Sequence, residues 1–285
     1  MHTQSTPYTL NLGGRLFTIK EPLVMGIVNL TPDSFYPGSR TSADYAAVRA
    51  QQMLEEGADI IDVGGVSTRP GARNIDTEEE WQRLAKGLEA IRKRLPEAIL
   101  SVDTYNSVTA RRCVEQFGVD IINDISGGDM DPDMYATVAQ LGVPYILMHT
   151  KGTPKTMQRK CQYSDVTAEV ISNLAFKDAE LRRLGVCDVI VDPGFGFAKN
   201  VEQNFDMLNR LEMFHALHRP LLVGISRKSM ISRALGCRPA EALNGTTVLN
   251  TVALSKGAHI LRVHDVKEAS EAVKLFSLLK KTQSD

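Results

Sequence analysis

The sequence contains little cysteine, and its cysteines lie far apart. The four of them, at positions 113, 161, 187 and 237, form no C-x-x-C pair and have no histidine at the spacing of a metal ligand. This pattern argues against a structural zinc site. We therefore expect free thiols, which are typical of proteins in a reducing cytosol.

An excess of charge of either sign is also missing. The chain has 33 lysine and arginine residues against 34 aspartate and glutamate residues, which leaves a formal net charge of −1. No global field therefore favours nucleic acid or an anionic membrane surface. Any anion that this protein binds must be held by a local cluster of cations.

Long apolar runs are absent as well. No run reaches the length of a transmembrane helix, and the first residues lack the basic start and apolar core of a signal peptide. The sequence therefore predicts a soluble cytoplasmic protein.

Short apolar runs take their place, each followed by a polar turn and an amphipathic stretch. The runs, which predict strands, span 24–30, 59–63, 99–103, 120–125, 145–148, 189–192, 221–225 and 259–263. The helices are expected over 44–57, 77–95, 106–117, 132–142, 165–185, 200–217, 238–256 and 266–281. About eight such units without a polar linker favour an α/β fold with a single (β/α)₈ TIM barrel. An open doubly wound sheet is the alternative, disfavoured because no G-x-G-x-x-G follows the first strand.

The start of the chain has a different pattern from the rest. Residues 8–20 alternate around Gly13-Gly14, which predicts a β-hairpin turning on the glycine pair. We expect residues 1–21 to form an N-terminal tail and β-hairpin capping the barrel, residues 22–285 to form the barrel, and the whole chain to be one domain.

The polar ends of the predicted strands carry the candidate chemistry, because all strands of such a barrel open on one face. The run 220–225 ends abruptly in Ser226-Arg227-Lys228-Ser229, and residues 228–235 read as the first turns of a helix. Backbone N–H groups at a helix start, with two cations nearby, predict an anion site. A solvated basic loop is the alternative.

Acidic and amide side chains end three of the other strands. Asp103, Asn123 and Asp192 each follow an apolar run, where a buried carboxylate needs hydrogen-bond donors. A planar heterocycle with adjacent ring N–H and exocyclic NH₂ groups would supply them, and a purely structural network is the alternative. Phe195 and Phe197 are candidates for an aromatic wall, although core packing would explain one of them.

Cations end the last strand and follow the second. Arg262 and His264 alternate with apolar residues, so both side chains should face the barrel interior, and Arg69 lies in a glycine-rich loop. With Asn29 on the adjacent first strand, this set predicts a clamp for diphosphate and Mg²⁺. Few carboxylates face it, so we expect the ion to be held mainly by phosphate oxygens.

The joint occurrence of these motifs is similar to a known family. Residues 29–35 (NLTPDSF), 62–65 (DVGG), 67–71 (STRPG), 123–125 (NDI), 192–197 (DPGFGF), 226–229 (SRKS) and 262–265 (RVHD) together resemble the dihydropteroate synthases of folate biosynthesis. The resemblance runs from about residue 24 to residue 280. Each motif alone would be weak, and their shared order is what makes the match specific.

The resemblance implies an activity and roles for individual residues. The reaction is the condensation of 6-hydroxymethyl-7,8-dihydropterin diphosphate with 4-aminobenzoate, giving 7,8-dihydropteroate and diphosphate by dissociative substitution, with transfer of a pterin-methyl group. By similarity, the pterin is held by Asp103, Asn123, Met148, Asp192 and Lys228. The diphosphate and Mg²⁺ are held by Asn29, Arg69, Arg262 and His264, with Asn29 as the metal ligand. The 4-aminobenzoate pocket is bordered by Thr68, Pro70, Phe197, Lys228 and Ser229. The catalytic set is Asn29, Arg69, Lys228, Arg262 and His264.

Other expectations also follow from the resemblance. The family suggests a homodimer and a target of sulfonamides. Val66 stands where the family commonly has Glu, and residues 36–40 replace a more usual Ser-Asp-Gly-Gly turn. Both departures lie in loops that we expect to be mobile, so they concern how these loops close. A pterin-dependent methyltransferase and a pterin-binding scaffold without activity are the alternatives.

Overall fold

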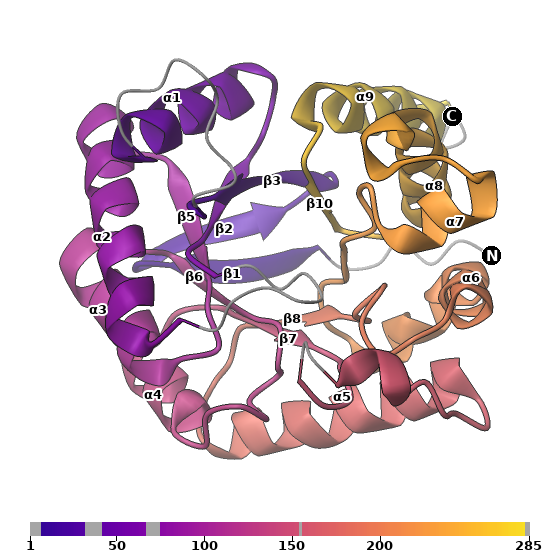
Figure 1. Ribbon diagram of the computed structural model, residues 1–285, viewed down its shortest axis with the longest axis horizontal. Coiled ribbons are helices and arrows are strands. Elements are labelled where there is room, and N and C mark those ends of the chain that lie inside the picture. Colours follow the sequence, from indigo (N-terminus) through magenta and orange to yellow (C-terminus); the bar gives the residue numbers. More distant parts are fainter. Residues whose placement is uncertain (1–6, 32–41, 67–74, 154–155, 283–285) are drawn as a thin grey trace.

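The computed structural model describes residues 7–31, 42–66, 75–153 and 156–282. Helices surround a central set of strands, and a small hairpin lies across that set (Figure 1). The strands are β1 (Tyr8–Leu12), β2 (Arg15–Ile19), β3 (Leu23–Asn29), β4 (Ile60–Gly64), β5 (Ile99–Asp103), β6 (Ile121–Asp124), β7 (Tyr145–Met148), β8 (Val189–Asp192), β9 (Leu222–Val223) and β10 (Ile260–Val263).

The eight strands β3 to β10 form one parallel sheet that closes on itself. Their order is β8-β7-β6-β5-β4-β3-β10-β9, and a parallel bridge between Val191 and Leu221 joins the two ends. The N–H of Val191 donates to the carbonyl of Pro220 at 2.9 Å across this seam. The predicted (β/α)₈ barrel with an N-terminal hairpin is therefore confirmed.

The α-helices alternate with the strands and cover the outside of the barrel. They are α1 (Ser42–Glu55), α2 (Thr77–Arg94), α3 (Ser107–Phe117), α4 (Met134–Leu141), α5 (Val166–Arg183), α6 (Val201–Asn209), α7 (Ser229–Leu235), α8 (Leu243–Ser255) and α9 (Val266–Lys281). Glycines end two of these helices: Gly118 and Gly142 adopt φ of 58° and 64°, the left-handed conformation that glycine takes without steric cost.

Three predicted elements were wrong in extent. The helix over 200–217 stops at Asn209 and continues as a 3₁₀ helix (Leu211–Leu217), because Arg210 leaves helical geometry at φ −109° and ψ 24°. The helix over 238–256 begins as a separate 3₁₀ turn (Pro239–Glu241), because Ala242, at φ −84° and ψ 14°, leaves helical geometry before α8 starts. The strand over 221–225 keeps only Leu222–Val223, since a turn from Lys228 N–H to the carbonyl of Ile225 follows directly.

Apolar side chains fill the interior of the barrel at its N-terminal end. Leu10, Leu12 and Ile19 of the hairpin pack with inward-facing residues of the strands, which are Leu23, Met25, Ile60, Ile121, Ile146, Ile190, Leu222 and Ile260. The N–H of Asn11 also donates to the carboxylate of Asp188 at 2.9 Å. Burial of this apolar surface seals one end, so the polar strand ends gather at the other.

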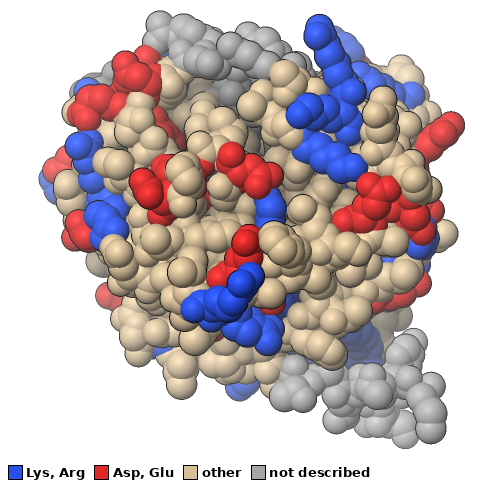
Figure 2. Space-filling view, turned by 90° about the horizontal axis from the view of Figure 1, so that it is seen from below, with Lys and Arg blue, Asp and Glu red and all other residues tan. Residues whose placement is uncertain are grey.

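The outer surface is mixed in charge. Lysine and arginine side chains are interspersed with aspartate and glutamate on the face shown in Figure 2, in keeping with a net charge of −1. In the part of the chain that the structure describes, no helix is both long and apolar enough to cross a membrane.

Candidate active site

The strand register aligns polar side chains at the C-terminal end of the barrel. Asn29 is paired with Gly64, Gly64 with Asp103, and Asp103 with Asn123, so these positions face the interior at one level. Gly64 leaves space between its neighbours: a Cβ there would lie 3.6 Å from both Asn29 Oδ1 and Asp103 Cβ. Asn29 and Asp103 therefore approach each other over a glycine.

Arg262 of β10 joins this level and points inward, as predicted. Its Nε donates to Asp62 Oδ2 at 2.7 Å, and its Nη2 contacts Asp62 Oδ2 at 2.6 Å and donates to Asp103 Oδ2 at 2.7 Å. The amide of Asn123 donates to the same Asp62 oxygen at 3.0 Å. One guanidinium thus holds two carboxylates from neighbouring strands.

Opposing effects set the pKa of Asp103. Burial raises the pKa of Asp103 to about 7, although Arg262 opposes the shift, and the nearby carboxylate of Asp62 raises this pKa further. Arg262 is shared between two carboxylates, so it cannot compensate each fully. Asp103 therefore changes charge in the physiological pH range.

Asp192 and Lys228 form a second charged pair at the same end. Burial raises the pKa of Asp192, while the cation of Lys228 and the N–H of Gly194, which donates to Oδ1 at 2.7 Å, oppose this shift. Burial lowers the pKa of Lys228 to about 8, and Asp192 opposes that change. Each group thus favours the charged form of the other, against the effect of burial.

Aromatic groups border this pair. Lys228 Nζ donates to the carbonyl oxygen of Phe195 and lies 4.7 Å from the ring centroid of Phe197. Phe195 is fully buried, whereas Phe197 is half-buried. Of the two candidates for an aromatic wall, Phe197 lies at the site and Phe195 belongs to the core.

Only some residues of the motif 226–229 face the site, and the others make structural contacts. Ser226 Oγ lies 3.1 Å from His264 Nδ1 and accepts a hydrogen bond from the His264 N–H at 3.2 Å. Arg227 has a φ of 54° and its guanidinium turns to Asp265, with two contacts of 2.8 Å. Of the two cations expected to bind an anion, only Lys228 faces the cluster. Ser229 is exposed at the start of α7.

The remaining candidates lie where the strand order places them or outside the described residues. Met148 is buried and is paired with Asp192 in the register of β7 and β8. Thr68, Arg69 and Pro70 lie outside the residues that the structure describes, as do the departures from the family pattern at 36–40.

Sequence reasoning gave no role to Asp62. It is fully buried and is the shared acceptor for Arg262 and Asn123, while its Oδ1 has no hydrogen-bond partner among the residues that the structure describes. A carboxylate inside the apolar run 59–63 was the available signal, because such a group needs a buried donor.

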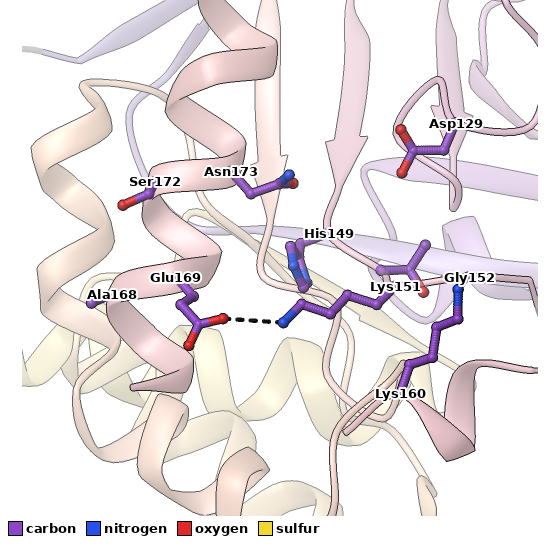
Figure 3. Close-up of a pocket in the computed structure, with 10 residues that line it drawn as sticks. Asp129, His149, Lys151, Gly152, Lys160, Ala168, Glu169, Ser172 and Asn173 are labelled. Atoms are coloured by element: carbon purple, nitrogen blue, oxygen red, sulfur yellow. Dashed lines mark hydrogen bonds and ion pairs between the residues drawn. The ribbon is translucent and has the colours of Figure 1, made fainter. Parts of the chain in front are cut away.

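A pocket of about 640 Å³ opens beside the end of β7. Residues from the β7 loop and from α5 line it, and the ion pair between Lys151 and Glu169, 3.1 Å long, crosses it (Figure 3). His149, which lines this pocket, also contacts Lys199 behind the site, at 3.0 Å.

Fold and site define an enzyme of the (β/α)₈-barrel class with a cluster of buried charges at the C-terminal strand ends. A family model described as "Pterin binding enzyme" matches residues 25–264. The chain belongs to this family and, within it, to the dihydropteroate synthases.

Known proteins support this assignment. The chain is 44% identical to dihydropteroate synthase of Escherichia coli K12 over 265 residues, 92% of this chain and 93% of that protein. The structure of the Xanthomonas albilineans dihydropteroate synthase with 4-aminobenzoic acid is similar, with a TM-score of 0.89, 35% identity and coverage of 96% and 99%. The structure of the Yersinia pestis dihydropteroate synthase in a sulfonamide drug complex is also similar, with a TM-score of 0.90 and 36% identity. The match covers 96% of this chain and 100% of that one.

Proposed function

We propose that this protein condenses 6-hydroxymethyl-7,8-dihydropterin diphosphate with 4-aminobenzoate to give 7,8-dihydropteroate and diphosphate. It is a transferase of folate biosynthesis, as its relatives are. The observation that carries the proposal is the cluster of Asp103, Asn123 and Asp192 beside the cations of Arg262 and Lys228. Such a site offers acceptors to a heterocycle and positive charge to its leaving group.

The pterin lies between the two charged pairs. Asp192 accepts from the ring N–H and the exocyclic amine, since a carboxylate has two oxygens at matching spacing. Asn123 and Asp103 contact the opposite edge, Lys228 donates to the ring, and Met148 packs near its face. The burial of Asp192 supports this role, because its second oxygen is free for a ligand donor once Gly194 binds the first.

The diphosphate lies above Asn29 and Arg262, with His264 and Arg69 as further donors. The residues present fit Mg²⁺ that arrives on phosphate oxygens: Asn29 offers an amide oxygen, and no group of three acidic, histidine or cysteine residues among those described forms a cage. Bound in this way, Mg²⁺ would neutralise charge on the diphosphate. Arg262 adds charge-assisted hydrogen bonds to the same oxygens.

The reaction needs no protein nucleophile. The C–O bond to diphosphate breaks first, and the arylamine attacks the methylene cation that the pterin stabilises. Phe197, Lys228 and Ser229, with Thr68 and Pro70, border the 4-aminobenzoate pocket, and Ser229 at the helix start receives the carboxylate. The protein contributes position and charge neutralisation.

The test of the function is release of diphosphate by the purified protein. We expect release from the pterin diphosphate to depend on 4-aminobenzoate, with one dihydropteroate formed for each diphosphate. Dependence on a corrinoid in place of 4-aminobenzoate would indicate a pterin-dependent methyltransferase, and binding without turnover would indicate a scaffold.

Pterin binding should depend on pH in a bell shape. Affinity for 6-hydroxymethyl-7,8-dihydropterin, which carries no diphosphate, should rise as Asp103 loses its proton near its pKa of about 7. It should fall above about 8, where Lys228 loses its positive charge. Calorimetric titrations from acid to alkaline pH measure both limbs.

The control for the acidic limb is Asp103→Asn, which should remove it. As pH rises toward 7, the same pKa shift lowers the stability of the fold, whereas deprotonation of Asp103 raises the affinity for the pterin. Because folding raises the pKa of Asp103 from 3.8, this group lowers the unfolding free energy as pH rises from there to about 7. A pH-independent affinity of the unmodified protein would contradict the assignment of Asp103 and Lys228.

Sulfonamides should compete with 4-aminobenzoate. Sulfamethoxazole presents an arylamine and an anionic group at similar spacing, and a sulfonamide drug complex is known for the Yersinia pestis relative. We expect the apparent KM for 4-aminobenzoate to rise linearly with sulfamethoxazole while kcat stays constant. Steady-state assays at several inhibitor concentrations check this, and inhibition that 4-aminobenzoate does not relieve would contradict it.

The enzyme also acts as a cytoplasmic homodimer of one-domain subunits. Free thiols at all four cysteines support a reducing compartment. Exposed leucines of α9 support the dimer, because Leu275, Leu278 and Leu279 are each at least 60% exposed. Light scattering after size exclusion measures the oligomeric state.

A further inference from the structure

The loop between β8 and α6, residues 193–198, forms the wall of the site next to Lys228. Five consecutive carbonyl oxygens in it accept hydrogen bonds from side chains. The acceptors and donors are Gly194 from Lys199, Phe195 from Lys228, Gly196 from Gln158, Phe197 from Lys199, and Ala198 from Tyr163. The conformation of this loop is therefore set by side chains around it.

The backbone of the loop requires such support. Gly194, Gly196 and Ala198 have φ of 72°, 80° and 49°. Ala198 is not a glycine, and a non-glycine residue in this region costs about 1 kcal/mol or more unless its surroundings hold it. A Cβ on Gly194 would overlap the backbone oxygen of His149, and one on Gly196 would lie 3.0 Å from Lys228 Cδ. The loop is thus packed tightly between β7 and Lys228.

Lys199 supplies two of the five donors from a buried position. Its ammonium group donates to Gly194 O at 3.0 Å and to Phe197 O at 2.9 Å, and lies 3.0 Å from His149 Nδ1. Lys199 is 3% exposed and His149 is 1% exposed, so both side chains are buried in the folded protein. Burial lowers the pKa of Lys199 to about 7, and in its protonated form the ammonium only donates, so the imidazole then accepts at Nδ1. Burial and the neighbouring lysine lower the pKa of His149 to about 2, which keeps the ring neutral.

The opposite side of the loop contacts the proposed reaction site. The Gly194 N–H binds Asp192 Oδ1, the Phe195 carbonyl binds Lys228 Nζ, and the ring of Phe197 lies against the same ammonium. Lys199 holds the carbonyls of Gly194 and Phe197. If its side chain were removed, these carbonyls would be free to shift, and the loop groups that contact Asp192 and Lys228 would move with them.

We infer that Lys199 is a positioning residue for the proposed reaction: together with its acceptor His149, it fixes the loop 193–198 so that Lys228, Asp192 and Phe197 meet the substrates in the productive arrangement. The inference rests on the proposed function. It assigns Lys199 no contact with substrate, since three protein acceptors already use its donors.

The test compares two buried lysines that each tie down a loop. Lys177 is also buried, and its ammonium donates to Gly127 O at 2.9 Å and Asp129 Oδ1 at 2.6 Å. We expect Lys199→Met and Lys177→Met both to lower the unfolding temperature. Only Lys199→Met should raise the KM for 4-aminobenzoate, by about tenfold, which corresponds to ~1.4 kcal/mol. Equal KM values for the two variants would overturn the inference.

A second pair of variants leaves Lys199 in place. His149→Asn keeps an acceptor oxygen close to the position of Nδ1, whereas His149→Leu removes it. We expect His149→Asn to retain the KM values of the unmodified protein and His149→Leu to raise them as Lys199→Met does. The same KM in both variants would count against a requirement for the acceptor.

A crystal structure of the Lys199→Met protein separates failure of this inference from failure of the proposed function. Displaced Phe197 and Lys228 side chains would support the inference whether or not the protein turns over these substrates. An unchanged loop would overturn it. Absence of diphosphate release from the unmodified protein would contradict only the function.

Discussion

Replacing Arg262 by alanine should reduce turnover about a thousandfold or more, because the departing diphosphate loses its principal charge-assisted donor. The guanidinium is held in position by Asp62 and Asp103 at 2.6 to 2.7 Å. It therefore needs little reorganisation when charge develops on the leaving group. Steady-state kcat/KM and single-turnover rates with the pterin diphosphate measure the effect.

The same substitution also affects stability, so a control must separate the two. Without Arg262, the buried Asp62 keeps only the amide of Asn123 as a donor, and breaking such a pair costs about 3 to 5 kcal/mol. Arg219 offers a matched control, since its side chain is 15% exposed and its Nε binds Asp178 at 2.9 Å away from the site. We expect Arg219→Ala to lose stability, although less than Arg262→Ala because Asp178 keeps its ion pair with Arg182 at 3.2 Å, and to keep kcat.

A conservative variant tests the role of Arg262 in a protein that should still fold. Arg262→Lys keeps a cation beside Asp62 but loses the planar fork, so it should fold and still lose most of the turnover. If Arg262→Ala or Arg262→Lys kept turnover within about tenfold of the unmodified protein, a loss too small for a missing leaving-group donor, the diphosphate role of Arg262 would be wrong.

The sequence predicted the barrel because its local signals and its tertiary structure agree. The run Ile99–Asp103 changes from apolar to polar within one residue, and the strand ends at that change. Arg262, a polar residue that alternates with apolar ones, was placed correctly on the interior side. Strand ends on a common face then allowed the site to be assembled without coordinates.

Pairing between distant residues could not be predicted in the same way. Arg262 and Asp62 are 200 positions apart, and Lys199 and His149 are 50 apart. Nothing local distinguishes a carboxylate that binds a ligand from one that holds an arginine. The residue pattern alone also did not tell which cation of 226–229 enters the site, and only the family resemblance assigned Lys228 to it. The positive φ of Arg227 directs its guanidinium to Asp265, and Lys228 is left facing Asp192.

Asp192→Asn should separate catalysis from stability more sharply than any other substitution. The pterin offers two donors to Asp192, and an amide would oppose one of them with its own NH₂ group. Sites built to pair a polar group discriminate by about 10⁴ when the pairing is lost, so kcat/KM for the pterin diphosphate should fall about a thousandfold or more. Steady-state kinetics with that substrate measure the loss.

Stability should change in the opposite direction. Folding raises the pKa of Asp192, mainly through burial, even with Lys228 nearby. An acid with a raised pKa destabilises the folded state above its unfolded value, and a neutral amide removes that cost. The single structural bond, from Gly194 N–H to Oδ1, survives because the amide oxygen accepts it. Thermal unfolding at neutral pH should therefore show an equal or higher midpoint.

Asp124 on β6, which β7 separates from β8, provides the matched contrast. It is also buried with a raised pKa, but its two oxygens accept from Ser126 N–H, Gly128 N–H and the hydroxyl of Tyr145. An amide NH₂ would face at least one of these donors, so Asp124→Asn should lower the unfolding midpoint and retain turnover per folded molecule. Among the described residues, Asp192 meets one structural donor and Asp124 meets three, and this difference supports the proposed ligand-binding role of Asp192. Loss of stability in both variants with turnover kept in both would contradict that distinction.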